Sequence, residues 1–237
     1  MIKKERQENL LEIIKQRKYC TVNFLSKRLY VAPITIRRDL CEMEAAGLVT
    51  RCYGGATFPD HENREVPFEM RNASNASIKE VLAKKAAKRI HTGDVVFLDA
   101  SSTVSRIVQY ISREQNLTII TNSTLIAEKL KEKHIRCYLT GGISVENSYA
   151  LLGSIAEKNV SDLYANVCFF SAQGIDEDGT ISDQSEEEST LRRLMIKNSK
   201  EQYFLFDGSK YRKRFAFKIC SVQDISGFIT DRNDISL

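Results

Sequence analysis

Apolar residues recur with the period of an α-helix from the first turn of the chain. In residues 5–18, Leu10, Ile13 and Ile14 share one face while the positions between them are polar or charged. This spacing predicts an amphipathic helix that buries one side.

A second helix is predicted directly after Thr21. The Thr21 side chain stands where an N-cap residue accepts a backbone hydrogen bond, and Val22, Leu25 and Leu29 follow at intervals of three and four. The helix is predicted to stop before Pro33, because a proline disfavours helical dihedral angles in the residue that precedes it.

The third helix is predicted to begin near Pro33, which fits a first helical turn. Ile36, Leu40 and Met43 form its apolar stripe at i, i+4 and i+7. Asp39 is expected to turn inward and pair locally, with Arg28, as a structural residue.

The two arginines of the third helix are predicted to leave the protein. Thr35 and Arg38 project from the side opposite the apolar stripe, and Arg37 projects from a flank. On an arbitrary helix such a pair usually belongs to a solvated face, but here a preceding helix and a short turn favour a recognition helix.

Residues 48–58 predict a hairpin after the helix stop at Gly47, with the turn at Gly54 and Gly55. Three helices and a hairpin make a winged helix-turn-helix. Arginine side chains of such a helix pair with guanine edges or phosphates in a major groove, and the wing contacts the flanking backbone. The candidate DNA-binding residues are Thr35, Arg37, Arg38, Arg51 and Lys27.

The charge distribution agrees with this interpretation. Residues 1–58 hold 11 Lys and Arg against 6 Asp and Glu, a net charge of +5 within a chain whose formal charge is +4. The remainder is close to neutral, so the basic character belongs to the segment predicted to bind a polyanion.

The segments "TIRRDLCEMEAAGLVTR" and "YGGA" resemble the N-terminal signature of the DeoR family of bacterial transcriptional regulators, over about residues 5–57. Ala32 and Pro33 depart from it, because the family often has a serine there. The resemblance implies that residues 1–57 are a winged helix-turn-helix domain and that the partner is double-stranded promoter DNA.

Residues 58–77 are polar, hold two of the three prolines and show no sustained periodicity, which predicts a linker. Residues 78–237 then alternate between helical patterns and short apolar runs. Such alternation is typical of parallel strands with crossover helices, and it predicts an α/β domain with a mainly parallel sheet. The expected strands are 94–100, 117–122, 136–142, 166–175, 202–207, 215–221 and 227–231.

Polar and small residues follow these strands, where α/β sheets bind ligands. They include Asp99, Ser101, Ser102, Thr103, Asn122, Gly141, Gly142, Gly174, Asp207 and Lys210. The serines and threonine suit a phosphate or a helix cap, and Lys210 suits a phosphate or a solvent-exposed turn.

The second domain also resembles the DeoR-type sensor domain, whose fold is akin to ribose-phosphate isomerases and which binds sugar phosphates. The resemblance implies a phosphate loop of Asp99, Ser102 and Thr103, crevice walls of Asn122, Gly141 and Gly142, and polar contacts from Lys79, Glu188, Asp207 and Lys210, with Arg71 as a weaker candidate. Ser101 and Gln173 depart from the family pattern, which has a glycine and an acid there.

Other classes of protein find little support in the sequence. No apolar run reaches the length of a membrane span or a secretory signal, so a cytoplasmic protein is expected. The six cysteines show no metal-binding spacing and are expected to be buried thiols. No metal or cofactor is predicted.

The sequence therefore predicts a DNA-binding regulator, by family default a repressor of a sugar uptake or catabolism operon, acting as a homodimer or homotetramer and controlled by a phosphorylated sugar. Two alternatives remain open. One is a sugar-phosphate isomerase or deaminase fused to a DNA-binding module, and the other is a constitutive repressor that has lost effector binding.

Overall fold

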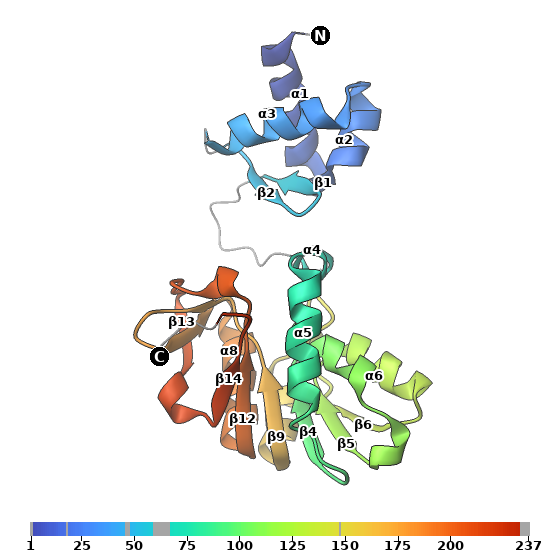
Figure 1. Cartoon of the computed structure of the whole chain (residues 1–237), viewed down its shortest axis with the longest axis vertical. Coiled ribbons are helices and arrows are strands. Elements are labelled where there is room, and N and C mark those ends of the chain that lie inside the picture. Colours follow the sequence, from blue (N-terminus) through green and yellow to red (C-terminus); the bar gives the residue numbers. More distant parts are fainter. Residues whose placement is uncertain (1, 18, 46–47, 59–66, 147, 233–237) are drawn as a thin grey trace. The chain divides into compact units, whose positions relative to one another are not determined.

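The computed structural model describes residues 2–17, 19–45, 48–58, 67–146 and 148–232 (Figure 1). The chain divides into two compact units, Met1–Val66 and Pro67–Leu237. Residues 67–77, expected to belong to the linker, are part of the second unit. Gly47 and most of the remaining linker lie outside the described residues.

The first unit contains three helices and a small antiparallel sheet with strand order β1-β3-β2. Its elements are α1 (Lys3–Arg17), β1 (Tyr19–Thr21), α2 (Val22–Leu29), α3 (Pro33–Ala45), β2 (Thr50–Cys52) and β3 (Gly55–Thr57). Thr21 caps α2 as predicted, accepting a 3.0 Å bond from the Phe24 amide. The strand β1 was not predicted, because three residues are too few to show a period.

The core of this unit consists of the residues that the helical spacing selected. Leu10, Ile14, Leu25, Ile36 and Leu40 are all at most 1% exposed. Packing these stripes together fixes α3 against α1 and α2 and leaves the opposite side of α3 uncovered.

Asp39 points inward, as predicted, but its partner is Arg6 of α1 and not Arg28. Arg6 Nε donates to Asp39 Oδ2 at 2.5 Å and a second guanidinium nitrogen donates to Oδ1 at 3.1 Å. Arg28 is exposed. The side of α3 that carries Asp39 faces α1, so only a cation on α1 can reach the carboxylate.

The second unit is built on a six-stranded sheet with order β14-β12-β9-β4-β5-β6. Every neighbouring pair is parallel, in agreement with the predicted fold class. The strands are β4 (Val95–Leu98), β5 (Thr118–Thr121), β6 (Arg136–Leu139), β9 (Ala165–Phe170), β12 (Ser199–Leu205) and β14 (Gly227–Ile229).

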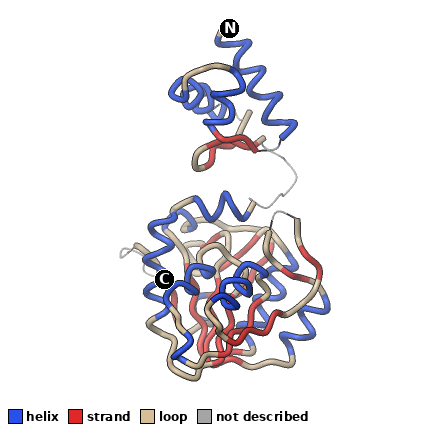
Figure 2. The backbone as a smooth tube through the Cα atoms, turned by 90° about the vertical axis from the view of Figure 1, so that its right-hand side faces the viewer, coloured by secondary structure: helices blue, strands red, loops and turns tan. Residues whose placement is uncertain are grey.

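Helices cover both faces of this sheet, as Figures 1 and 2 show. Alternate strand residues enter two separate cores: Val96 and Leu98 pack beneath one set of helices, whereas Phe97 packs beneath the other. This division explains why the strands read as continuous apolar runs. The helices are α5 (Ala76–Ala87), η1 (Val104–Tyr110) and α6 (Thr124–Glu132) on one face, and α7 (Ser154–Ser161) and α8 (Glu186–Lys197) on the other.

Three elements differ from the expectation. A short helix, α4 (Phe68–Ala73), lies in the segment predicted to lack periodicity. Residues 101–103 ("SST") are followed not by an α-helix but by the seven-residue 3₁₀ helix η1. The predicted strand 215–221 forms β13 (Phe217–Ser221), which pairs outside the main sheet with β11 (Thr180–Asp183), itself paired with β10 (Gly174–Ile175). The six-residue helix α4 and the short hairpin of β10 and β11 are too brief to show a period in the sequence.

Two smaller elements and the cysteines complete the description. The hairpin of β7 (Ile143–Ser144) and β8 (Leu151–Leu152) was not predicted. All six cysteines are free, but contrary to the prediction only three are buried: Cys41 is exposed, and Cys52 and Cys137 are half-buried. Cys41 lies on the uncovered side of α3. Among the described residues, no helix is long and apolar enough to cross a membrane.

Candidate DNA-binding face and candidate anion site

The uncovered side of α3 presents the predicted cations to solvent. Arg37 and Arg38 are exposed, Thr35 is half-buried, and Lys27 is exposed in the last turn of α2. The Arg38 side chain is 82% exposed, and its contact with Glu42 is long, at 3.8 Å. An exposed pair at this separation holds a side chain only weakly, so Arg38 is available to a ligand.

Arg51 is held differently from the other candidates. Its guanidinium contacts Glu44 at 3.7 Å and the Cys41 sulfur, and its amide donates to Glu44 at 2.9 Å. The wing strand β2 is thus tied to the end of α3. Arg51 must leave these contacts before it binds a phosphate.

Two lysines from distant parts of the second unit lie at the carboxyl ends of the strands, Lys79 buried and Lys210 half-buried. Lys79 of α5 is 4% exposed; its Nζ donates to Ser102 Oγ at 3.1 Å and to the Arg71 carbonyl. Lys210, which follows β12, donates to Ser171 Oγ at 3.0 Å and to the Ala172 carbonyl at 2.6 Å. In the described part of the chain, no ion pair joins either ammonium to a carboxylate.

Burial lowers the pKa of both lysines. The pKa of Lys79 falls to about 7, because of desolvation and then repulsion from Lys210. The pKa of Lys210 falls to about 8, with desolvation as the main cause and Asp207 opposing it. Asp207 has a lowered pKa despite its burial, because Ser209 donates to it and Lys210 is near. A bound anion would restore the charge of both ammonium groups.

The hydroxyl residues Ser101, Ser102 and Thr103, which follow β4, have different roles. The Ser101 hydroxyl accepts from the Val104 amide at 3.2 Å, so the helix-capping interpretation holds for it. Ser102 Oγ is bonded to Lys79. Thr103 is fully buried, and its hydroxyl has no hydrogen-bond partner among the described residues. Ser102 and Thr103 are therefore the hydroxyls that remain available beside the lysines.

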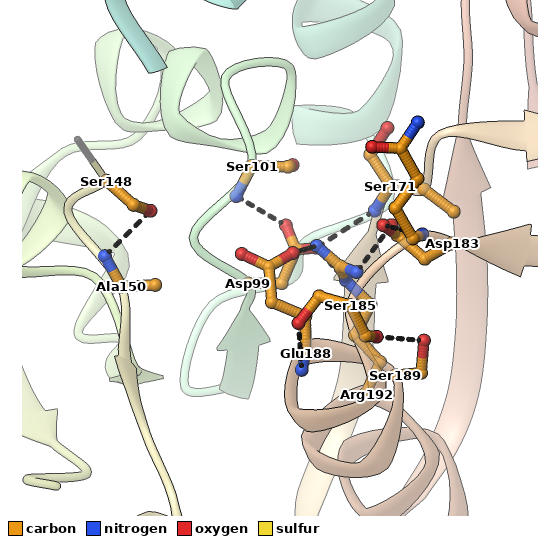
Figure 3. A network of polar contacts seen from close by, with 12 residues as sticks. Asp99, Ser101, Ser148, Ala150, Ser171, Asp183, Ser185, Glu188, Ser189 and Arg192 are labelled. Atoms are coloured by element: carbon orange, nitrogen blue, oxygen red, sulfur yellow. Dashed lines mark hydrogen bonds and ion pairs between the residues drawn. The ribbon is translucent and has the colours of Figure 1, made fainter. Parts of the chain in front are cut away.

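Next to the lysines, Arg192 of α8 binds three carboxylates (Figure 3). Its Nε donates to Asp99 at 2.9 Å, Nη1 to Asp183 at 2.8 Å and Nη2 to Glu188 at 2.5 Å. All four side chains are at most 6% exposed. Asp99 and Glu188, predicted as effector contacts, are thus already engaged by an arginine.

Asp99 also joins β4 and β9, the neighbouring strands between which the strand order of the sheet reverses. Its Oδ1 accepts from the Ser101 amide and its Oδ2 from the Ser171 amide, each at 3.1 Å. Because β4 precedes Asp99 and the neighbouring strand β9 precedes Ser171, this bond spans the topological switch point of the sheet, where α/β folds bind ligands.

A cavity of about 10 Å³ lies beside the arginine cluster and is bordered by Asp99, Asn122, Glu188 and Arg192. This volume is about that of one water molecule. Asn122 Oδ1 is buried without a hydrogen-bond partner in the described part of the chain. A polar group of a ligand would satisfy it.

The predicted glycines contact other elements. A side chain at Gly142, which has φ +116°, would meet the Leu152 carbonyl at 2.4 Å, and one at Gly174 would meet the Lys213 carbonyl at 2.4 Å. Gly141, with φ +70°, lies near Ile155 of α7. These glycines permit close backbone packing, and the structure does not bring them against the lysines.

Comparison with known families assigns both units. The model of the DeoR-like helix-turn-helix domain matches residues 6–62, and that of the DeoR C terminal sensor domain matches residues 74–232. The chain belongs to the DeoR family of transcriptional regulators. This membership confirms the predicted family and a regulator rather than an enzyme.

Relatives in the family match nearly the whole chain. An uncharacterised HTH-type transcriptional regulator, YulB of Bacillus subtilis, is 35% identical over 98% of this chain and 90% of its own. The regulator GolR of Listeria innocua is 32% identical, over 96% and 90%. The lactose phosphotransferase system repressor of Staphylococcus epidermidis is 30% identical, over 99% and 94%.

Solved structures resemble this DeoR-family protein in fold alone. The tetrameric eIF2B-beta2-delta2 complex from C. thermophilum matches with a TM-score of 0.51 and 13% identity, over 66% of this chain and 56% of that chain. Ribose 5-phosphate isomerase A from Methanocaldococcus jannaschii matches with a TM-score of 0.44 and 19% identity, over 58% and 55%.

Sequence reasoning missed several residues that shape both sites of this regulator. Arg192, Asp183 and Ser171 hold the buried cluster, Asn75 donates to Asp207 at 2.9 Å, and Arg6 pairs with Asp39. A signal for one of them was present: Arg192 stands four residues after Glu188 on a helix, a spacing at which opposite charges meet.

Proposed function

We propose that this protein is a repressor of a sugar uptake or catabolism operon, and that a phosphorylated sugar bound by Lys79, Lys210, Ser102 and Thr103 controls its binding to the promoter. Among its relatives is a lactose phosphotransferase system repressor, which supports a sugar-related operon. Thr35, Arg37, Arg38 and Lys27 are proposed to contact DNA, with Arg51 joining them when it leaves Glu44.

The observation that carries the effector half of this proposal is a pair of lysines, Lys79 buried and Lys210 half-buried, whose ammonium groups form no ion pair with a carboxylate among the described residues. A cation withdrawn from water is costly, and proteins usually pair it. Here the hydrogen-bond acceptors of both lysines are hydroxyl and carbonyl oxygens. A phosphate dianion would supply the missing charge, and Asn122 Oδ1 and Asp207 would accept hydrogen bonds from sugar hydroxyls.

The site is also connected to the element that follows the interdomain segment. Lys79 bonds to the Arg71 carbonyl of α4, and Asn75, just before α5, bonds to Asp207. A phosphate that draws Lys79 toward itself, together with a sugar hydroxyl that donates to Asp207, would compete with both contacts. Only such a difference between the free and bound arrangements can shift the DNA-binding equilibrium.

The first test is fluorescence anisotropy of the full chain on its own upstream DNA at fixed salt, with a panel of sugar phosphates and the matching free sugars. We expect one phosphate to change the affinity and its free sugar to have no effect. Tight DNA binding that is indifferent to every phosphate would replace this proposal with a constitutive repressor. Absence of specific binding to that DNA would refute the repressor itself.

Replacing Arg38 with alanine is expected to weaken operator binding by about 1–3 kcal/mol if its guanidinium pairs with a base. The measurement compares operator with a shuffled duplex across a salt series. Arg28→Ala, an exposed arginine of α2 outside the proposed contact set, is the control and should change binding less. Equal weakening on both duplexes, with a shallower salt slope, would assign Arg38 to a phosphate instead.

Paired recognition helices are part of the same proposal. Helix-turn-helix dimers place two recognition helices about one DNA turn apart, so a homodimer or homotetramer is expected. Sedimentation of the protein alone and with operator DNA measures this directly. A monomer in both samples would remove the paired arrangement.

A further inference from the structure

The side of α3 opposite its core carries an apolar residue among its cations. Ile34, Arg38 and Cys41 follow at i, i+4 and i+7 and so form one stripe. That stripe lies opposite the buried residues Ile36 and Leu40. Ile34 is therefore in the first turn of the helix, on the same line as Arg38, whose side chain is 82% exposed.

Ile34 is 70% exposed although it is a large β-branched residue. A single exposed apolar side chain is ordinary on a protein surface and by itself indicates nothing. Its position distinguishes it: the N-terminal residues of a recognition helix are those that reach base edges in the major groove. The neighbouring Arg37 and Arg38 provide the positive charge that attracts DNA to this face.

We infer that Ile34 reads a thymine by packing against its 5-methyl group. The methyl group of thymine is the apolar feature that a base pair presents in the major groove, and an aliphatic side chain is its natural contact. This inference rests on the proposed DNA binding and names a specificity determinant within it.

The helix geometry also predicts where the thymine lies. Residues four apart on a helix are separated by about 6 Å along its axis. That distance is about two base steps of 3.4 Å each. The thymine should therefore lie within about two base pairs of the base or phosphate that Arg38 contacts.

The test replaces thymine with deoxyuridine, which removes only the 5-methyl group, at one position at a time in the operator. Anisotropy of the full chain gives the affinity for each duplex. Loss of one buried methyl is expected to weaken wild-type binding about fourfold at one position of each half-site. Ile34→Ala should bind the thymine duplex about as weakly and lose its sensitivity to uracil there.

Two further variants control the experiment. Ile34→Val keeps a branched side chain and should retain the sensitivity to uracil. Ile155→Ala removes a comparably exposed isoleucine, 61% exposed, from the first turn of α7 in the other unit and should behave as wild type. Equal thermal midpoints of the variants would show that folding is unchanged.

Three results would overturn the inference. Wild-type binding that is indifferent to uracil at every position would show that no thymine methyl is read, with the proposed repressor left intact. Ile34→Ala that keeps full sensitivity to uracil would assign the reading to another residue. Failure of the wild type to bind any upstream duplex would refute the proposed function and this inference together.

Discussion

Replacing Lys210 with methionine should abolish the response to the sugar phosphate while operator affinity without effector stays unchanged. Lys210 is half-buried, its ammonium donates to Ser171 and lies near Lys79, and methionine fills a similar volume without the charge. Truncating one partner of a buried charge pair costs 2–5 kcal/mol or more, so effector affinity should fall at least about thirtyfold. Isothermal titration measures the affinity, and anisotropy measures release.

The pH dependence of effector binding tests the same site. The ligand requires ammonium groups, and in the free protein these have a pKa of about 7 at Lys79 and about 8 at Lys210. Affinity should therefore fall as pH rises from 7 to 9. Each group contributes up to about tenfold per pH unit above its pKa, so Lys210→Met should flatten the profile above pH 8.

The free energy of unfolding of the unliganded protein should rise with pH, whereas effector affinity falls. Lys210 has a folded pKa of about 8, below its ordinary value of 10.5. Its burial therefore costs folding free energy that is fully present below pH 8 and disappears as pH rises to 10.5. At pH 7 this cost is about 3 kcal/mol, so Lys210→Met should be more stable than wild type there, as binding sites often trade stability for function.

Lys213→Met is the matched control, because Lys213 is an exposed lysine three residues away. It should leave effector affinity, the pH profile and stability as in wild type. An unchanged effector response in Lys210→Met would remove Lys210 from the site and leave phosphate recognition to Lys79, Ser102 and Thr103. If Lys210→Met is more stable than wild type but keeps its effector response, the ammonium of Lys210 costs stability without binding the effector.

Replacing Arg192 with methionine should destabilise the second unit by about 3–5 kcal/mol at pH 7. Asp99, Asp183 and Glu188 surround this guanidinium from β4, β11 and α8, and all are buried. Without the cation, three carboxylates remain close together out of water. Urea denaturation, monitored by a signal from the sheet, measures this loss in the free energy of unfolding.

The deficit of Arg192→Met should become smaller in acid. Without the guanidinium, mutual repulsion and burial raise the folded-state pKa of the carboxyl groups above their unfolded values. Stability is then greatest below the unfolded pKa, near pH 4, and is lost as pH rises through the raised pKa. Arg193→Met, which loses exposed contacts to Thr190 and the Lys218 carbonyl, should cost less and show little pH dependence. A deficit that is equally large at pH 4.5 and 7.5 would indicate lost packing rather than unpaired charge.

Much of the fold could be predicted because burial has a local period. The stripe of Ile36, Leu40 and Met43 predicted the buried face of α3, and the apolar runs at 94–100 and 117–122 predicted β4 and β5. Several short elements, including the three-residue β1 and the two-residue β7, escaped prediction because they are too short to show a period, and α7 was not predicted either.

The candidate sites were predicted less completely than the elements. Residues after strands were identified because the carboxyl ends of parallel strands meet at one edge, and Lys210 and Ser102 do lie there. Glu188 was named without its partner Arg192, and Asp39 was assigned to a nearby arginine although Arg6 binds it. For Asp39 the sign of the required charge was evident but the identity of the partner was not, whereas for Glu188 no charged partner was predicted.

The sequence by itself thus determined the helical faces of the first unit, the alternation of helices and parallel strands in the second, and the exposure of Arg37 and Arg38. The helical faces follow from a period of 3.6 residues and the strands from short apolar runs, and both can be recognised in a local window of the chain. Only the tertiary structure decided which polar groups meet: Arg6 with Asp39, Arg192 with three carboxylates, and Lys79 with Lys210 around one site. The physical reason is that charges far apart in the chain acquire neighbours, and therefore shifted pKa values, only through the order in which strands and helices pack.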